Sequence, residues 1–305
     1  MRSDETGTLV LVADATARIG AGHAMRLGTL GAAWKRAGGS VRAVGRVEIG
    51  FVRDRYAALG IEIGDADPVA GDVLVVDSYD AAVRFRWSQL PAPALRILVD
   101  DGIGGDIPPG FGVVWSPNAY ASAASYRGYA GVVLAGTEYL AIRGDIPRWI
   151  QPRNGEILVS LGGGRPSRVL VEAMSILDEL AGAERFAATG DWAPAGWRRV
   201  APEDLWSAAV SARQLVTAAG STVWEAASMG IPVVLLMTAD NQRQVYRWCR
   251  DAGVPGLNAL LVDAEFLAHQ LRALLAVPSA LPPVTDGSDR VVSRLRELVA
   301  LRRAS

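Results

Sequence analysis

Residues 151–167 have the sequence QPRNGEILVSLGGGRPS, in which one structural pattern ends and a second begins. The polar residues 151–155 interrupt the chain, and residues 157–161 then form a new apolar strand that runs into the glycines at 162, 163 and 164. A buried strand, a glycine turn and a helix in succession are typical of parallel α/β sheets. The stretch therefore predicts a domain boundary near residue 152.

Strands and helices alternate on both sides of that boundary. Before it, we expect strands at residues 9–13, 40–44, 72–77 and 96–100, and helices at 22–37 and 51–59. After it, we expect strands at 157–161, near 186, at 214–217 and at 233–236, helices at 167–180 and from 222 and 241, and a charged amphipathic helix at 288–303 that caps one of the domains. Continuous apolar strands indicate parallel sheets buried on both faces. The predicted fold class is α/β, with two doubly wound, Rossmann-like domains at residues 1–151 and 152–305 that face a central cleft.

Composition narrows the classes of function. The 305 residues carry a net charge of -1 without a basic stripe, so we expect no nucleic-acid partner. Cys249 is the only cysteine, which excludes an intrachain disulfide and a cysteine metal cluster. The first residues lack the apolar core of a signal peptide, and no apolar run approaches the roughly 20 residues that span a bilayer. We therefore expect a cytoplasmic protein without a membrane partner, and the sequence leaves the oligomeric state open.

The turn after the first strand is the first candidate site. Gly20 and Gly22 lie between that strand and the following helix, where glycines let the backbone approach a ligand and point amide groups at it. A tight turn without a ligand would explain both glycines equally well. The spacing is not that of a dinucleotide-binding loop, because no third glycine follows at the required place.

His23 opens the helix beside these glycines and is one of only two histidines. The positive end of a helix disfavours imidazolium, so we expect this side chain to be neutral near pH 7 and able to accept a proton as a general base. A histidine that caps or packs under the helix is the alternative, and position alone leaves both open. His269 lies within a predicted helix, where an exposed or packing role is expected.

Acidic residues follow two of the buried strands. Asp77 ends one strand, and Asp100 and Asp101 end the next. Such residues often cap the following turn, but a carboxylate here could also orient His23 or bind sugar amides and hydroxyls. No histidine or third acid lies at a ligand-like spacing, so we predict neither a metal nor another cofactor.

Residues 18–26, RIGAGHAMR, resemble the N-terminal signature of the PseG family, which are UDP-2,4-diacetamido-2,4,6-trideoxy-β-L-altropyranose hydrolases of pseudaminic acid biosynthesis. Further stretches match that family in order over residues 9–255. They are Asp77-Ser-Tyr79, Asp100-Asp101, Asn118-Ala-Tyr120 with Tyr126, residues 136–143 (GTEYLAIR), 160–163 (SLGG), 219–225 (AGSTVWE) and Asn241-Gln242. The order and spacing of the set make the resemblance specific.

The resemblance implies a GT-B architecture, similar to that of the N-acetylglucosaminyltransferase that makes lipid II, with water as the acceptor. It implies that His23 activates the attacking water and that a UDP-sugar is cleaved with inversion and without a metal. Asp77 and Asp101, at the ends of their strands, are the candidate carboxylates that assist His23. The implied sugar contacts are Gly20, Gly22, Arg26, Tyr79, Asn118, Tyr120 and Arg143. The predicted UDP contacts are Gly162, Gly163, Gly220, Ser221, Thr222, Glu225, Asn241 and Gln242. The first five lie at strand-to-helix turns, where backbone amides could meet a diphosphate, although a plain turn would also explain the glycines at 162 and 163.

Four of the UDP contacts have structural alternatives. Thr222 and Glu225 fit a capping box, in which the glutamate bonds back to the helix start, whereas the resemblance implies that Glu225 binds the ribose hydroxyls. Asn241 and Gln242 could reach the sugar or ribose, or be ordinary residues at a helix start.

The sequence departs from the family at two places. Val12 stands where the family usually has an arginine, and tryptophans 192, 197 and 206 enrich a segment where none are expected. Sugar specificity is therefore less defined than the nucleotide site. A GT-B glycosyltransferase that uses an unknown acceptor and a non-catalytic UDP-sugar binding protein are the alternative functions.

Overall fold

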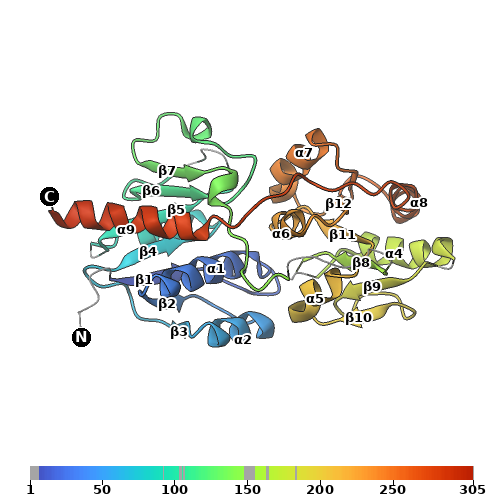
Figure 1. Cartoon of the computed structure of the whole chain (residues 1–305), viewed down its shortest axis with the longest axis horizontal. Coiled ribbons are helices and arrows are strands. Elements are labelled where there is room, and N and C mark those ends of the chain that lie inside the picture. Colours follow the sequence, from blue (N-terminus) through green and yellow to red (C-terminus); the bar gives the residue numbers. More distant parts are fainter. Residues whose placement is uncertain are drawn as a thin grey trace. The chain divides into compact units, whose positions relative to one another are not determined.

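The computed structural model describes residues 7–91, 93–102, 105, 107–147, 155–162, 165–182 and 184–304. The chain divides into two compact units, the first comprising Met1–Gly144 with Thr285–Ser305 and the second comprising Asp145–Val284. Each unit is built on its own parallel sheet with helices packed against it (Figure 1). The prediction of an α/β protein with two parallel sheets is confirmed.

The first unit has a seven-stranded sheet in the order β3-β2-β1-β4-β5-β6-β7, and every neighbouring pair is parallel. The strands are β1 (Thr8–Val12), β2 (Ser40–Val44), β3 (Glu62–Gly64), β4 (Val73–Val76), β5 (Leu95–Val99), β6 (Val113–Ser116) and β7 (Val132–Ala135). The helices are α1 (Gly22–Arg36), α2 (Gly50–Ala58), α3 (Ala81–Ser88), α9 (Ser288–Ala304) and the short 3-10 helices η1 (Ala123–Tyr126) and η2 (Thr137–Tyr139).

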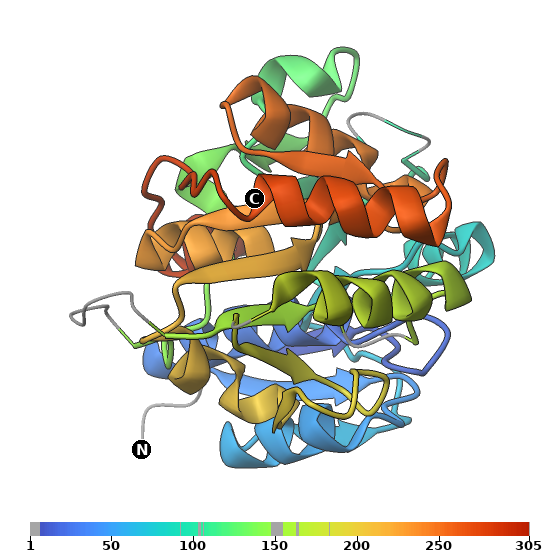
Figure 2. The same ribbon diagram turned by 90° about the vertical axis from the view of Figure 1, so that its right-hand side faces the viewer.

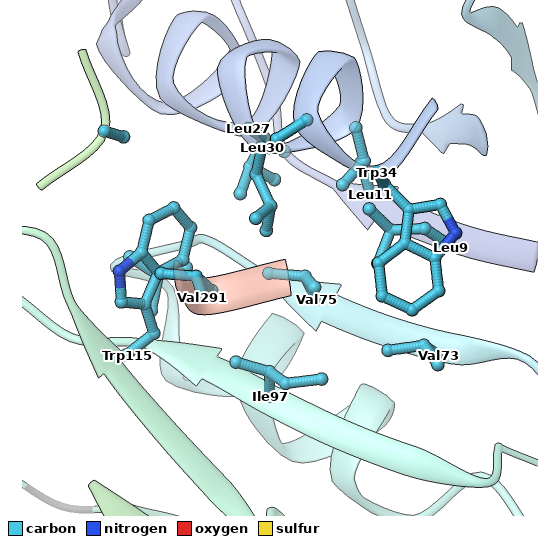
Figure 3. Close-up of a cluster of buried hydrophobic side chains, with 14 of the residues drawn as sticks. Leu9, Leu11, Leu27, Leu30, Trp34, Val73, Val75, Ile97, Trp115 and Val291 are labelled. Carbon is cyan, nitrogen blue, oxygen red and sulfur yellow. The ribbon is translucent and has the colours of Figure 1, made fainter. Parts of the chain in front are cut away.

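The core of the first unit fixes α1 over the central strands. Leu27, Leu30 and Trp34 project from α1 onto the sheet, where they meet Val75 and Ile97 (Figure 3). Full burial of each such side chain contributes about 1.5–3 kcal/mol. The opposite face of the sheet packs against α3. The start of α1 and the ends of the central strands, which carry the candidate site, thus rest on a continuous core.

The C-terminal helix α9 belongs to the first unit. Its buried side chains, among them Val291 and Leu295, join the same core as α1, and Arg296 donates a hydrogen bond of 2.6 Å to the carbonyl oxygen of Ala37. The second unit therefore ends at Val284, and the sequence-based assignment of all residues from 152 to 305 to the second domain is wrong for this helix. An amphipathic pattern predicts that a helix buries one face, but not which sheet it covers.

The second unit has a six-stranded parallel sheet in the order β10-β9-β8-β11-β12-β13. The strands are β8 (Ile157–Ser160), β9 (Phe186–Thr189), β10 (Arg198–Val200), β11 (Gln214–Ala218), β12 (Val233–Met237) and β13 (Gly256–Asn258). The helices are α4 (Arg168–Ala181), α5 (Leu205–Ala209), α6 (Thr222–Met229), α7 (Arg243–Asp251), α8 (Ala264–Leu274), η3 (Pro202–Asp204) and η4 (Asp240–Gln242). Figure 2 shows α4 and α8 side by side on one face of this sheet, where their apolar residues share a core.

Two of the three unexpected tryptophans are core residues. Trp197 stacks on Phe186 with ring centroids 4.5 Å apart and donates to Asp178 Oδ1 at 2.6 Å, and Trp206 is buried. Trp192 is partly buried against the same core as Trp197. The tryptophan-rich segment thus has a packing role in the second unit.

No helix in the described part of the chain is long and apolar enough to span a bilayer.

Candidate active site

The candidate site of the first unit lies at the carboxyl ends of the central strands. His23 stands at the start of α1, Asp77 follows β4, Asp101 follows β5, and Asn118 and Tyr120 follow β6. Because the strands are parallel, the loops after them meet at one edge of the sheet, the edge at which α/β proteins bind ligands. The topology thus brings together five predicted site residues that are up to 97 positions apart in the chain.

His23 and Asp77 form a buried pair at the centre of the site. His23 Nδ1 lies 2.5 Å from Asp77 Oδ1, and the two residues are only 7% and 2% exposed. An ionised carboxylate only accepts hydrogen bonds, so the proton of a neutral imidazole must be on Nδ1. Arg26 Nη2 lies 3.3 Å from the same nitrogen, but a guanidinium has no acceptor, so the Nδ1 proton can be donated only to Asp77. Nε2 is then left with its lone pair.

Arg26 holds both aspartates. One helical turn after His23, its Nε and Nη2 donate to Asp77 at 2.5 and 2.6 Å. Its Nη1 and Nη2 donate to Asp101 at 2.8 and 2.9 Å. Four donor contacts on two carboxylates occupy most of the five N–H groups of a guanidinium. The predicted sugar contact Arg26 is thus largely committed to the protein.

Asp101 accepts hydrogen bonds from most of the side chains in the outer part of the site. Besides Arg26, its carboxylate accepts from Tyr79 Oη at 2.6 Å and from Asn118 Nδ2 at 2.7 Å, and its carbonyl oxygen accepts from Tyr120 Oη at 2.8 Å. Both carboxylate oxygens therefore already accept two hydrogen bonds each. This arrangement fits a carboxylate that positions its neighbours rather than one that takes up a proton.

The charges of the site follow from these contacts. Burial raises the pKa of Asp77, but Arg26 and His23 outweigh burial and hold that pKa well below its usual range. The pKa of Asp101 is lowered in the same way, against burial, by Arg26. Burial together with Asp101 raises the pKa of Tyr79 and of Tyr120. At neutral pH the site thus contains two carboxylates, one guanidinium and two protonated phenols.

Tyr79 forms an outer wall next to the histidine. Its ring meets the imidazole of His23 edge to face, with centroids 4.6 Å apart, and the residue is 50% exposed. A half-exposed aromatic ring beside a polar cluster is suited to the apolar face of a sugar ring.

The two glycines before His23 differ in what the backbone requires. Gly20 has a φ of +85°, a conformation that L side chains rarely adopt. Gly22 has an ordinary φ, and a Cβ built on it meets nothing within 4 Å. The fold explains the first glycine but not the second.

Val12 and Arg143 complete the predictions for the first unit. Val12 is buried in β1, and its carbonyl oxygen accepts from the backbone N–H of Asp77 at 2.9 Å. Position 12 thus supports Asp77 through the main chain. Arg143 lies half-buried after η2, near the end of the first unit, and its role as a sugar contact stays a prediction.

In the second unit, polar residues end β8 and β9 and occupy the last position but one of β11, at the carboxyl edge of the sheet. Ser160 ends β8 and accepts from Thr189 Oγ1 of β9 at 3.1 Å, and Thr217 is buried in β11. Gly162 follows Ser160 with a φ of +89° and open space beside it, whereas Gly163 lies outside the described residues. Gly220 after β11 also has open space where a Cβ would be.

The start of α6 differs from the capping box that the sequence offered as an alternative. Ser221 is the N-cap in helical conformation without a side-chain capping bond, so Thr222 is already the first residue of the helix. Thr222 is therefore not the N-cap that the capping-box alternative requires. Glu225 is half-buried in the first turn.

Gln242 has a local partner. Its Oε1 accepts from the backbone N–H of Thr238 at 2.8 Å, and its Nε2 donates to Thr238 Oγ1 at 3.1 Å. The expected helix from Asn241 is η4 followed by α7, and Asn241 is exposed in η4. Gln242 thus fixes the turn after β12, whereas the side chain of Asn241 faces solvent.

The described residues contain no cluster of three or more histidine, cysteine or acidic side chains that could hold a metal ion. Cys249 is buried, and burial raises the pKa of its thiol to about 12.

Comparisons with known proteins identify the fold. No protein-family model matches the chain, and no curated protein matches it. Among solved structures, the chain is similar to MurG of Acinetobacter baumannii, with 14% identity and a TM-score of 0.54 over 98% of this chain and 100% of that one. It is also similar to a Listeria monocytogenes protein assigned as a UDP-N-acetylglucosamine 2-epimerase, with 12% identity and a TM-score of 0.62 over 96% of each chain. A third is the spinosyn rhamnosyltransferase SpnG complexed with thymidine diphosphate, with 16% identity and a TM-score of 0.56 over 97% of this chain and 96% of that one. The fold is therefore that of the GT-B glycosyltransferases.

Proposed function

We propose that the protein hydrolyses a UDP-activated amino sugar at its anomeric carbon, with inversion of configuration. The observation that carries the proposal is the buried His23–Asp77 pair, which leaves Nε2 of a neutral imidazole as a proton acceptor. In the reaction, a water molecule gives a proton to Nε2 while its oxygen attacks the anomeric carbon. The bond from that carbon to the phosphate oxygen breaks, and its electron pair leaves with UDP.

Asp77 has two tasks in this reaction. Its contact with Nδ1 fixes the tautomer and the orientation of the ring, and its charge stabilises the imidazolium that forms when Nε2 takes the proton. Asp77 remains ionised throughout, because Arg26 and His23 keep its pKa low despite burial. The positive charge on the histidine is thus compensated 2.5 Å away.

Asp101 and Arg26 act on the sugar site through their neighbours. Asp101 holds Tyr79, Asn118 and Arg26 at one carboxylate, and Arg26 in turn holds Asp77. In the proposal, the ring of Tyr79 lies against the sugar, and Asn118, Tyr120 and Arg143 provide polar contacts. Gly20 and Gly22 contribute the main chain beside the reacting carbon.

UDP is assigned to the second unit. The proposed diphosphate contacts are the backbone at Gly162, Gly163, Gly220, Ser221 and Thr222, and a helix N-terminus favours a leaving group that gains negative charge. Glu225 would bind the ribose hydroxyls, with Asn241 nearby in the chain, and Gln242 acts through the turn that it fixes. The thymidine diphosphate in the similar SpnG structure supports a nucleotide-sugar ligand.

The resemblance to the PseG family favours UDP-2,4-diacetamido-2,4,6-trideoxy-β-L-altropyranose as the substrate, and with it a place in pseudaminic acid biosynthesis in the cytoplasm. Val12, in place of the family arginine, is buried in the apolar cluster between the sheet and α3, and a related amino sugar could use the same catalytic pair.

The test is proton and phosphorus NMR of the protein with a panel of UDP-amino sugars, with neither acceptor nor metal. We expect UDP and a free sugar whose first-formed anomer is inverted. His23→Ala should abolish release, whereas His269→Ala, at the exposed histidine of α8, should not. Turnover at the wild-type rate by His23→Ala would refute the assigned base.

A glycosyltransferase is the second candidate, favoured by the similarity to glycosyltransferase structures. His23 would then take the proton of an acceptor hydroxyl instead of water. Binding of the UDP-sugar without UDP release, followed by release when an acceptor is added, would identify this reaction. Binding without release under any acceptor would indicate a non-catalytic UDP-sugar binding protein.

A further inference from the structure

Arg84 of α3 connects the two loops that carry the site aspartates. Its Nε donates to the carbonyl oxygen of Ser78 at 2.5 Å, and its Nη1 lies 3.8 Å from Asp100 Oδ1. Ser78 is the residue after Asp77, and Asp100 is the residue before Asp101. Nothing in the sequence singled out Arg84, because it lies in a helix rather than at the end of a strand.

The ends of this connection are well fixed. The side chain of Asp100 is 2% exposed and that of Arg84 13%. Asp100 Oδ1 also accepts from the backbone N–H of Gly102 at 3.2 Å, and its carbonyl oxygen accepts from Tyr126 Oη at 3.2 Å. A planar guanidinium that uses Nε for one partner and Nη1 for another fixes the distance between them more firmly than a single ammonium can.

The Arg84–Asp100 ion pair affects the surroundings of His23 through the charges near Asp77. The loops after β4 and β5 bring three aspartates, Asp77, Asp100 and Asp101, to one edge of the sheet, and Arg26 forms ion pairs with Asp77 and Asp101. Arg84 supplies a cation next to Asp100. Without Arg84, Asp100 would lose a charge partner at a buried position, and the backbone beside Asp77 would lose its anchor.

We propose that Arg84 is a positioning residue, which holds the loops after β4 and β5 together and thereby sets the geometry of the His23–Asp77 pair. The inference rests on the proposed function only for its effect on turnover. The effect on the histidine follows from the contacts themselves and is measured without a substrate.

The first experiment is NMR of the imidazole groups in the full chain. Only two histidines are present, so His269→Gln assigns the signals of His23. The Nδ1 proton in the buried 2.5 Å contact with Asp77 should give a slowly exchanging, far-downfield resonance. Arg84→Met should shift or broaden that resonance.

Arg86→Met is the matched control. Arg86 lies on the same helix, but it is exposed, contacts Asp67 at 3.4 Å and stacks over Trp87. This variant should leave the His23 resonance unchanged. Equal spectra for Arg84→Met and Arg86→Met, both folded by circular dichroism, would overturn the proposal.

Two further variants keep the test decisive if Arg84→Met does not fold. Asp100→Asn removes the carboxylate that faces Arg84 without altering α3. Arg84→Lys keeps the positive charge but removes the planar guanidinium that contacts two partners at once. Both should shift the His23 resonance, and a wild-type resonance in both would equally overturn the proposal.

Turnover gives a second readout once a substrate is identified. Displacement of a catalytic group by about 1 Å can lower a rate by about 100-fold. We therefore expect Arg84→Met to lower kcat by about 10- to 100-fold with little change in KM. Arg84→Lys should recover part of the loss. A lower kcat with an unchanged histidine spectrum would place the effect of Arg84 elsewhere, and a shifted spectrum without turnover in the wild type would overturn the proposed function alone.

Discussion

The substitution Gly22→Ala tests whether a ligand approaches the main chain beside His23. Gly22 is the first residue of α1, has an ordinary φ, and offers open space to a Cβ, so neither backbone strain nor crowding requires glycine there. Alanine at such a position restricts the unfolded chain and should raise stability by about 0.4–1 kcal/mol. The melting temperature should therefore rise by about 1–4 °C.

The same methyl group should impair the reaction. A ligand that packs against the main chain at Gly22 occupies the space that a Cβ would take, and a methyl carbon keeps other heavy atoms roughly 3.5–4 Å away. The ligand must then move by the order of 1 Å, which can lower kcat/KM by about 10- to 100-fold. Higher stability with lower activity is the expected combination.

Gly50→Ala provides the control. Gly50 is the first residue of α2, is exposed like Gly22, and has open space beside it. It should gain similar stability and keep full activity in the same UDP-release assay. If Gly22→Ala is as active as Gly50→Ala, no ligand approaches the backbone at Gly22, and the reasoning from the unexplained glycine is refuted.

Three further predictions concern the charges of the two units. Asp77→Asn should lower turnover by about 10⁴-fold, because an amide can donate to Nδ1 and stabilise the unproductive tautomer. Phosphorus NMR measures the rate. Wild-type turnover in a folded variant would contradict the proposed pair. The lowered pKa of Asp101 means that the unfolded chain binds its proton first, so this stabilisation is present above the ordinary aspartate pKa of about 4 and is lost as the pH falls below it. Melting temperatures measured from about pH 6 down to about pH 3 should accordingly fall less steeply for Asp101→Asn than for the wild type, and parallel curves would argue against the assigned charge. Glu225→Ala should weaken UDP binding by about 10- to 100-fold in calorimetry, because a charged hydrogen-bond acceptor is lost. Glu172→Ala, on the exposed surface of α4, should leave the affinity unchanged. Equal affinities of the two variants would remove Glu225 from the ribose site.

Most of the inner, buried strands could be predicted because their pattern is local. β1, β4 and β12 are runs of apolar residues with every position or nearly every position buried. The predictions omitted the edge strands β3, β7, β10 and β13, and also the inner strand β6, whose four residues are all buried. β3 consists of three exposed residues, and β10 of two exposed arginines and a valine, so only pairing with a neighbour makes them strands. Such pairing involves residues far apart in the chain, which a local pattern does not contain.

The sequence could nominate the residues of the candidate site, but not the hydrogen bonds between them. His23, Asp77 and Asp101 could be selected because each follows a strand end or opens a helix next to one. That Arg26 would hold both aspartates, and that Asp101 would be saturated by donors, depends on β1, β4 and β5 lying next to one another. The position of Arg84 depends in addition on how α3 packs against the sheet, and no spacing in the sequence encodes it.

The saturation of Asp101 separates the roles of the two aspartates in the proposed reaction. Asp77 and Asp101 contribute two negative charges and Arg26 one positive charge, so the pair of carboxylates is only half compensated while His23 is neutral. When the histidine takes a proton, the four groups become neutral as a set. The proton is thus stabilised most where Asp77 touches the ring, and Asp101 contributes by keeping Arg26 from neutralising Asp77 alone.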